Sequence, residues 1–197
     1  MITIAVTGGI ATGKTTICYL IKQIGIKTIN SDNVIKKIYE KNSSINKKIK
    51  KNYPFLFNTK NKLDLIKLSD EAFHNRELLC FLENITYPIL HKHRKRIIGQ
   101  AISLNQKAVC FEVPLLYEKG LEMDFDYVIV TICPLFLQKR RALKRKNMDP
   151  KKLKNIMEKQ NINLYKKKKV DCIVNTGIGR NNAIFRIKKF ITSKLKK

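Results

Sequence analysis

Short apolar runs alternate along this chain with longer stretches in which apolar residues recur every three or four positions. The apolar runs predict five buried strands, at residues 2–6, 26–29, 107–113, 127–132 and 172–174. The helical spacing predicts helices at residues 16–24, 33–39, 151–160 and 181–195, and one more that starts at residue 134. Strands that alternate with helices indicate an α/β fold in which a parallel sheet is flanked by helices on both faces.

Residues 42–104 follow a different pattern, because apolar residues recur there at helical spacing with no strand between them except an ambiguous stretch at 53–57. We expect a helical insertion in this region, with Pro88 at the start of one of its helices. The chain has no internal repeat and no linker long enough for a second independent domain. Its 197 residues therefore predict a single domain that carries a helical subdomain at about 42–104.

The strongest motif follows the first predicted strand and precedes the first predicted helix. Residues 8–15 read G-G-I-A-T-G-K-T and match the phosphate-binding pattern G-x-x-x-x-G-K-[ST]. In such a loop the backbone N–H groups and the positive end of the helix dipole converge on one spot and can hold a triphosphate. Lys14 can reach the β- and γ-phosphates, and the Thr15 hydroxyl can bind the Mg²⁺ that accompanies ATP.

Three carboxylates stand near the expected ends of strands, where ligands bind in open α/β sheets. Asp32 follows the second strand and can accept a proton from a substrate hydroxyl or help to hold Mg²⁺. Alternatively, Asp32 or Ser31 caps the helix that follows. Glu112 lies close to the place where a carboxylate would reach Mg²⁺ through water. Glu118 lies beyond it in the following loop, and either glutamate could be a surface carboxylate.

Two arginines follow the fourth strand in the pattern Q-x-x-R-x-x-x-R at residues 138–145. Arg141 and Arg145 are four residues apart, so a helix would place them on one face. Two guanidinium groups on one face can neutralise a phosphoryl group during its transfer, and such a segment can close as a lid over about residues 138–160. The alternative is a solvated basic helix.

The net charge of +26 is also found in nucleic-acid-binding proteins. Only eight of the 41 basic residues are arginine, although arginine is the preferred reader of phosphates and base edges. Lys, Ile and Asn have A/T-rich codons, so a biased genome would produce this composition. We therefore expect no specific nucleic-acid partner, only weak and salt-sensitive binding to polyanions.

The remaining composition favours a cytoplasmic protein. No apolar stretch approaches the roughly 18–20 residues of a membrane span, and the apolar N-terminal run is interpreted as a core strand rather than a cleaved signal. The five cysteines are scattered and contain no C-x-x-C pair, which fits reduced thiols. We expect no membrane partner, and a monomer or a weak homo-oligomer.

Two further segments complete a set of motifs that spans nearly the whole chain: P-L-L-Y-E at residues 114–118 and V-D-C-I-V-N-T-G at residues 170–177. With T-G-G-I-A-T-G-K-T-T at 7–16, N-S-D at 30–32 and the two-arginine pattern at 138–145, they resemble the dephospho-CoA kinase family. The corresponding family patterns are T-G-G-I-x-x-G-K-[ST]-T, D-A-D, P-L-L-x-E, Q-x-x-R-x-x-x-R and A-D-x-V-I-x-N-x-G.

The resemblance implies a P-loop NTPase fold of the nucleoside-monophosphate-kinase type, with a helical CoA-binding insertion and a lid. It implies transfer of the γ-phosphoryl group of ATP, with Mg²⁺, to the ribose 3′-hydroxyl of dephospho-CoA. Asp32 would be the base, Lys14 would hold the phosphates, Arg141 and Arg145 would stabilise the transition state, and Thr15 and Glu112 would hold the metal.

The resemblance also implies two sets of binding residues. The nucleotide would be held by Gly8, Gly9, Ile10, Ala11, Thr12, Gly13, Lys14, Thr15, Thr16, Asn175 and Gly177, the last two near the adenine. The acceptor would contact Asp32, Tyr87, Pro114, Leu115 and Glu118.

Three positions depart from the family pattern: Asn30 replaces the first Asp of D-A-D, Leu65 replaces a common arginine, and Tyr87 replaces the histidine of a His-Pro pair. Two other classes of function stay open. One is a P-loop kinase that phosphorylates a nucleoside monophosphate or a similar acceptor. The other is a nucleotide-dependent nucleic-acid-binding protein, against which the chain offers no motif of stacking aromatic residues.

Overall fold

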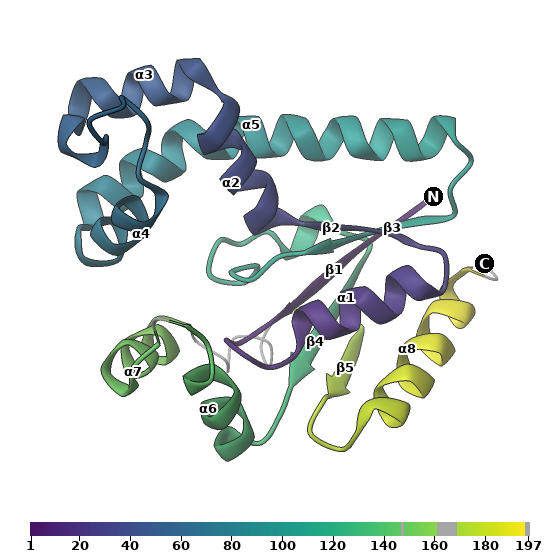
Figure 1. Cartoon of the computed structure of the whole chain (residues 1–197). Coiled ribbons are helices and arrows are strands. Elements are labelled where there is room, and N and C mark those ends of the chain that lie inside the picture. Colours follow the sequence, from purple (N-terminus) through teal and green to yellow (C-terminus); the bar gives the residue numbers. More distant parts are fainter. Residues whose placement is uncertain (147, 161–168, 196–197) are drawn as a thin grey trace. The chain divides into compact units, whose positions relative to one another are not determined.

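The computed structural model describes residues 1–146, 148–160 and 169–195, and the chain divides into two compact units. One unit combines Met1–Asn30 with Ala101–Lys197 and contains the sheet. The other unit is Ser31–Gln100 and is helical (Figure 1). Each unit has its own apolar core.

Five parallel strands form the sheet, in the order β2-β3-β1-β4-β5. Their bounds are Ile2–Gly8 for β1, Lys27–Asn30 for β2, Ala108–Glu112 for β3, Tyr127–Ile132 for β4 and Cys172–Asn175 for β5. The central strands are apolar and buried almost throughout, as expected of a parallel sheet covered on both faces. The predicted parallel sheet is confirmed, and each strand differs from its predicted range by at most two residues at either end.

Helices α1 (Lys14–Gln23) and α8 (Arg180–Leu195) cover one face of this sheet, where they pack beside each other (Figure 1). Their buried side chains join those of β1 and β4 in one cluster that includes Ile17, Ile21, Ile187 and Ile129. Gly25 follows α1 with a φ of 87°, a left-handed conformation that lets the chain turn back into β2. The sheet and these two helices fix the position of the loop between β1 and α1.

Two short helices follow β4: α6 (Leu135–Leu143) and α7 (Pro150–Lys159). Asp149 caps α7, because its carboxylate accepts a hydrogen bond from the N–H of Lys152 at 2.8 Å. A 3₁₀ turn, η2 (Glu122–Asp124), precedes β4. Within the described ranges, no helix combines the length and the apolar character needed to cross a bilayer.

The helical unit contains α2 (Ser31–Lys41), α3 (Ser43–Asn52), the 3₁₀ turn η1 (Pro54–Leu56), α4 (Leu65–His74) and most of α5 (Arg76–Ser103). The ambiguous stretch at 53–57 is therefore mainly the turn η1, with one isolated bridge between Phe57 and Leu63. The core of this unit consists of Ile38, Ile45, Ile49, Leu56, Leu68, Leu78 and Leu82.

Pro88 does not start a helix, as the sequence predicted, but lies inside α5. A proline in this position lacks the N–H that would bond to the carbonyl four residues earlier, which costs a helix about 3 kcal/mol. Side chains on both sides of the proline are buried, Leu78 and Leu82 before it and Ile97 after it, and their packing offsets the lost hydrogen bond. The prediction failed because tertiary packing outweighed the local preference of proline.

Candidate active site

The loop between β1 and α1 has the backbone conformation of a phosphate cradle. Ala11 has a φ of 57° and Gly13, the N-cap of α1, a φ of 96°, so two residues of the loop are left-handed. Left-handed residues interspersed in a turn bring successive N–H groups to one side and form an anion-binding concavity. The concavity opens at the N-terminus of α1, where the helix dipole adds positive potential.

Both motif glycines are required by their neighbours. A Cβ atom at Gly8 would collide with the carbonyl oxygen of Thr131 on β4, and one at Gly13 would lie 2.9 Å from Cγ2 of Thr176. The φ of Gly8, 143°, is also one that side chains with a Cβ rarely adopt. The pairing register explains the first collision, because Gly8 lies opposite Thr131 in the sheet.

We expect Gly8→Ala to weaken ATP binding at least about tenfold, because the new methyl group must push the loop away from β4. The matched control is Gly99→Ala in α5, where a Cβ meets nothing within 4 Å and alanine is the better helix former. Isothermal titration calorimetry with Mg-ATP measures both. Equal affinity of the two variants would contradict the close packing described for Gly8.

Lys14 lies over the loop from which it comes. Its ammonium donates hydrogen bonds to the carbonyl oxygens of Gly8 at 2.9 Å and Gly9 at 2.8 Å. A cation in this position sits at the mouth of the cradle that the loop N–H groups form. It can exchange these carbonyl contacts for phosphate oxygens without leaving the site.

Glu112 forms the acidic side of the site, at the end of β3. It is buried, and its two carboxylate oxygens accept different hydrogen bonds: one from the Thr15 hydroxyl at 2.9 Å and one from the Asn30 amide at 2.7 Å. Because the Thr15 hydroxyl donates to Glu112, the lone pairs of its oxygen can face a cation. A hydroxyl and a carboxylate are oxygen ligands of the kind that Mg²⁺ prefers, so these residues fit the metal that accompanies a nucleotide.

Thr176 connects the loop with α6 and with the segment after β5. Its hydroxyl donates a hydrogen bond to the carbonyl of Thr12 at 2.8 Å. The guanidinium of Arg141 donates to the hydroxyl of Thr176 at 2.9 Å and to its carbonyl at 3.1 Å. Arg141 is thus half-buried and held beside the phosphate loop, and its guanidinium carries five N–H donors, more than its two bonds to Thr176 use.

Arg145 lies elsewhere than the sequence predicted. Helix α6 ends at Leu143, so Arg145 falls in the turn that follows and does not share a helix face with Arg141. Its N–H donates to the carbonyl of Ala142 at 3.0 Å, which closes the last turn. The sequence predicted a continuous helix here because the alanine, leucine and lysine between these positions are good helix formers and give no stop signal.

Asn175 and Gly177 flank Thr176 in the loop after β5. The side chain of Asn175 accepts a hydrogen bond from the N–H of Gly177 at 2.9 Å, which folds the loop back on itself. A Cβ at Gly177 would collide with Cδ of Pro134, the N-cap of α6. The loop is therefore shaped by close contacts within the sheet unit.

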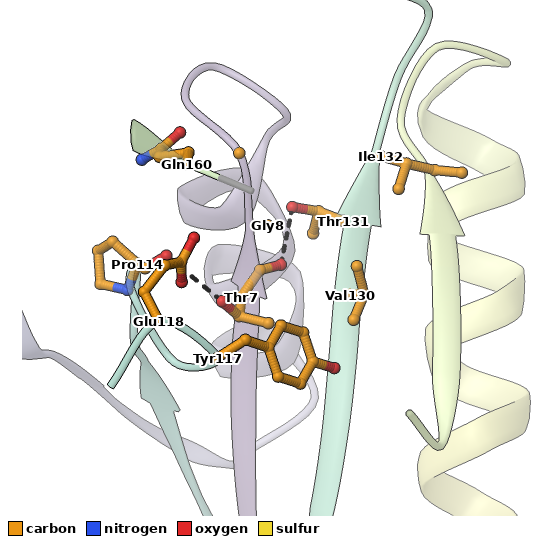
Figure 2. Close-up of a pocket in the computed structure, with 10 residues that line it drawn as sticks. Thr7, Gly8, Pro114, Tyr117, Glu118, Val130, Thr131, Ile132 and Gln160 are labelled. Atoms are coloured by element: carbon orange, nitrogen blue, oxygen red, sulfur yellow. Dashed lines mark hydrogen bonds between the residues drawn. The ribbon is translucent and has the colours of Figure 1, made fainter. Parts of the chain in front are cut away.

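The segment after β3 forms the far side of a small pocket beside the phosphate loop. Figure 2 shows Pro114 and Glu118 on one side of Thr7 and Thr131 on the other. The Thr7 hydroxyl donates to the Pro114 carbonyl at 3.5 Å, and the Thr131 hydroxyl donates to the Thr7 carbonyl at 3.1 Å. Leu115, by contrast, is exposed and does not line this pocket.

Asp32 and Tyr87 belong to the helical unit. Helix α2 begins at Ser31, so neither Ser31 nor Asp32 is its N-cap. Asp32 lies in the first turn, where the positive end of the helix dipole stabilises a carboxylate. Tyr87 lies in α5 directly before Pro88. Leu65 is the first residue of α4 and packs against the core of the unit, which accounts for an apolar residue at that position.

Several contacts of the site had weak signals or none in the sequence. Thr131 interrupts an apolar strand, and that polar residue in a buried run was a usable signal of its bond to Thr12 at 2.8 Å. Thr176 occupies the variable position of the N-x-G pattern, between Asn175 and Gly177, and so carried no prediction of its own. Gln160, whose side chain accepts a hydrogen bond from the N–H of Ile10, had no signal, because nothing local predicts that its helix ends beside the loop.

The parallel sheet, the glycine loop at the N-terminus of α1, and the Thr15–Glu112 pair define a P-loop kinase. A family model described as dephospho-CoA kinase matches residues 2–180. A dephospho-CoA kinase from Bartonella quintana (strain Toulouse) is 33% identical over 193 residues, which is 98% of either chain. The chain therefore belongs to the dephospho-CoA kinase family.

Solved structures agree with this assignment. Dephospho-CoA kinase from Campylobacter jejuni superposes with a TM-score of 0.67 and 28% identity, covering 98% of this chain and 97% of that one. A protein from Thermus thermophilus, at 24% identity, superposes with a TM-score of 0.84 and shows the same fold. The match covers 98% of this chain and 97% of that one. The predicted fold class is confirmed.

Proposed function

We propose that this chain transfers the γ-phosphoryl group of ATP to the ribose 3′-hydroxyl of dephospho-CoA, giving coenzyme A and ADP. Family membership supports the reaction. One observation supports the proposal at the level of residues: Lys14, the Thr15–Glu112 pair and Arg141 all lie at one phosphate-binding loop. The reaction is the final step of coenzyme A biosynthesis.

The phosphate groups are held by the loop of residues 8–16. Its N–H groups and the α1 dipole bind the phosphate oxygens, and the Lys14 ammonium neutralises the β- and γ-phosphates. The Arg141 guanidinium, held by Thr176, faces the charge that develops on the transferring group. Arg145, in the turn after α6, is proposed as the second arginine for this charge, although it does not share a helix face with Arg141. Asn175 and Gly177 are proposed to contact the adenine.

Magnesium would be held by the Thr15 hydroxyl directly and by Glu112 through water, an arrangement that their hydrogen bond prepares. When bound, the ion supplies neutralisation of charge on the β- and γ-phosphate oxygens. Asn30 orients Glu112 from the other side with its amide. As a neutral donor, Asn30 supports this carboxylate without adding a second negative charge.

Asp32 is proposed as the base. The ribose 3′-oxygen forms the new bond to the γ-phosphorus, the bond from this phosphorus to the β–γ bridging oxygen breaks, and the proton of the hydroxyl passes to the Asp32 carboxylate. The leaving group is ADP. A role of Asp32 in holding magnesium is the alternative, and the two roles give different kinetics.

The acceptor is assigned to two groups of residues. Pro114, Leu115 and Glu118 contribute from the loop after β3, and Asp32 and Tyr87 from the helical unit. Residues 42–104 are proposed as the CoA-binding subdomain and residues 138–160 as a lid that carries Arg141. We place the protein in the cytoplasm as a monomer or a weak homo-oligomer, with no specific nucleic-acid partner.

The test is ADP release from purified protein with Mg-ATP, comparing dephospho-CoA with AMP, CMP, UMP and adenosine as acceptors. We expect turnover with dephospho-CoA alone and coenzyme A as its product. Turnover on a nucleoside monophosphate instead would keep the fold class and overturn the acceptor. No turnover with any acceptor, combined with tight nucleic-acid binding above physiological salt, would support the nucleic-acid-binding alternative.

A further inference from the structure

Both backbone groups of one residue in the phosphate loop, Ile10, are bound by glutamine side chains. The Nε2 of Gln138, in α6, donates a hydrogen bond to the Ile10 carbonyl at 2.8 Å. The Oε1 of Gln160, directly after α7, accepts a hydrogen bond from the Ile10 N–H at 2.6 Å. Since a carbonyl can only accept and an N–H can only donate, the orientations of both side-chain amides are fixed by their partner.

These two bonds come from the two ends of the segment 138–160, which follows the sheet by way of α6 and α7. Gln138 is buried, with 3% of its surface exposed, and a buried amide of this kind is kept only where its bonds are made. Figure 2 shows Gln160 beside the loop that leaves Gly8. The glutamines therefore reach the loop from separate elements and meet at a single residue.

Apolar packing holds the same part of the loop. Ile10 and Ala11 are buried in a cluster with Ala142 of α6 and Leu153 of α7, and partly buried methionine and isoleucine side chains surround them. The apex of the phosphate loop is thus part of the small core of the α6–α7 segment. It is held there by side-chain packing and by the two glutamine bonds.

We propose that Gln138 and Gln160 are positioning residues that set the orientation of the two peptides flanking Ile10 for the triphosphate. Gln138 acts on the Ile10–Ala11 peptide through its carbonyl, and Gln160 acts on the Gly9–Ile10 peptide through its N–H. A trans peptide is planar, so its N–H points opposite to its C=O. With the Ile10 carbonyl directed at Gln138, the N–H of Ala11 is directed away from α6. Ala11 holds the left-handed φ of 57°, a conformation that costs a residue with a Cβ free energy and that the surroundings must impose.

This inference rests on the proposed use of ATP, but its first test needs no acceptor. The probe is Mg-ADP, titrated by calorimetry at pH 8 so that introduced carboxyl groups are ionised. Gln138→Glu keeps the shape of the side chain and loses the donor, so we expect ADP to bind at least about tenfold more weakly. Gln160→Glu keeps an acceptor for the Ile10 N–H, so it should bind ADP at least about fivefold more tightly than Gln138→Glu.

Two methionine variants remove the polar group without adding charge. Gln138→Met loses the donor and Gln160→Met loses the acceptor, so both should bind ADP more weakly than the wild type, and Gln160→Glu should restore what Gln160→Met loses. If both position-138 variants fail to fold, as judged by circular dichroism, the Gln160→Met and Gln160→Glu pair decides the question. The control is Gln23→Glu on the exposed part of α1, which should leave ADP binding unchanged.

The kinetic readout separates positioning from a general loss of structure. With dephospho-CoA as acceptor, we expect Gln138→Glu to raise KM for ATP and lower kcat, with KM for dephospho-CoA unchanged. Folded Gln138 variants with wild-type ADP affinity, or equal losses in Gln138→Glu and Gln160→Glu, would overturn the proposal. Failure of the acceptor assay together with the expected ADP affinities would overturn the proposed function and leave this inference standing.

Discussion

Arg141→Ala is expected to lower kcat at least about a thousandfold, the lower end of what an arginine at a transferring phosphoryl group contributes. The guanidinium makes two hydrogen bonds to Thr176, which in turn bonds to the carbonyl of Thr12 in the phosphate loop. Its position is therefore fixed before the nucleotide binds. Steady-state kinetics with saturating Mg-ATP and dephospho-CoA measure the loss.

The neighbouring residue supplies the control. Arg140 is exposed on the same helix, so Arg140→Ala removes the same charge and should keep kcat within about twofold of the wild type. Arg141→Lys tests geometry, because an ammonium does not reproduce the planar fork that spans both oxygens of Thr176. If Arg141→Ala turned over normally and only melted at a lower temperature, the role of Arg141 would be structural and not catalytic.

Asp32→Asn is expected to lower kcat by about a hundredfold to ten-thousandfold, the usual contribution of a general base, with ATP affinity nearly unchanged. The amide has almost the same shape as the carboxylate but cannot accept the hydroxyl proton. Comparing kcat with the dissociation constant for Mg-ATP separates these effects. A shift in the Mg²⁺ concentration needed for half-maximal rate would instead assign Asp32 to the metal.

Glu40→Gln provides the matched change on the same helix. Glu40 pairs with Lys36 at 3.9 Å on the exposed surface, where such a pair contributes little. This variant should behave as the wild type in both measurements. Near-normal turnover of Asp32→Asn would remove Asp32 from the mechanism.

The sequence predicted the parts of the fold that depend on local signals. The strand–loop–helix around residues 8–15 was predictable because the glycines, Lys14 and the flanking apolar runs all lie within about 20 residues. The parallel sheet followed from the alternation of strands and helices. The bond between Thr15 and Glu112 was anticipated only as a shared metal role, from the place of Glu112 at a strand end.

What the sequence could not predict depends on contacts between distant residues. The collision that requires Gly8 to be a glycine arises from Thr131, 123 positions away, and follows from the strand register. The bonds of Gln138 and Gln160 to Ile10 span 128 and 150 positions. The predicted helix ends were wrong for a different reason, since neither the continuation of α5 through its proline nor the end of α6 before Arg145 follows from local helix preference.

Thr176 has a consequence for how this sequence can change over time. Its side chain leaves no room for a Cβ at Gly13, accepts from Arg141 and donates to Thr12. A substitution at any one of these four positions alters the environment of the other three, so their effects on stability should not add. We therefore expect the chain to change these positions together or to keep all four.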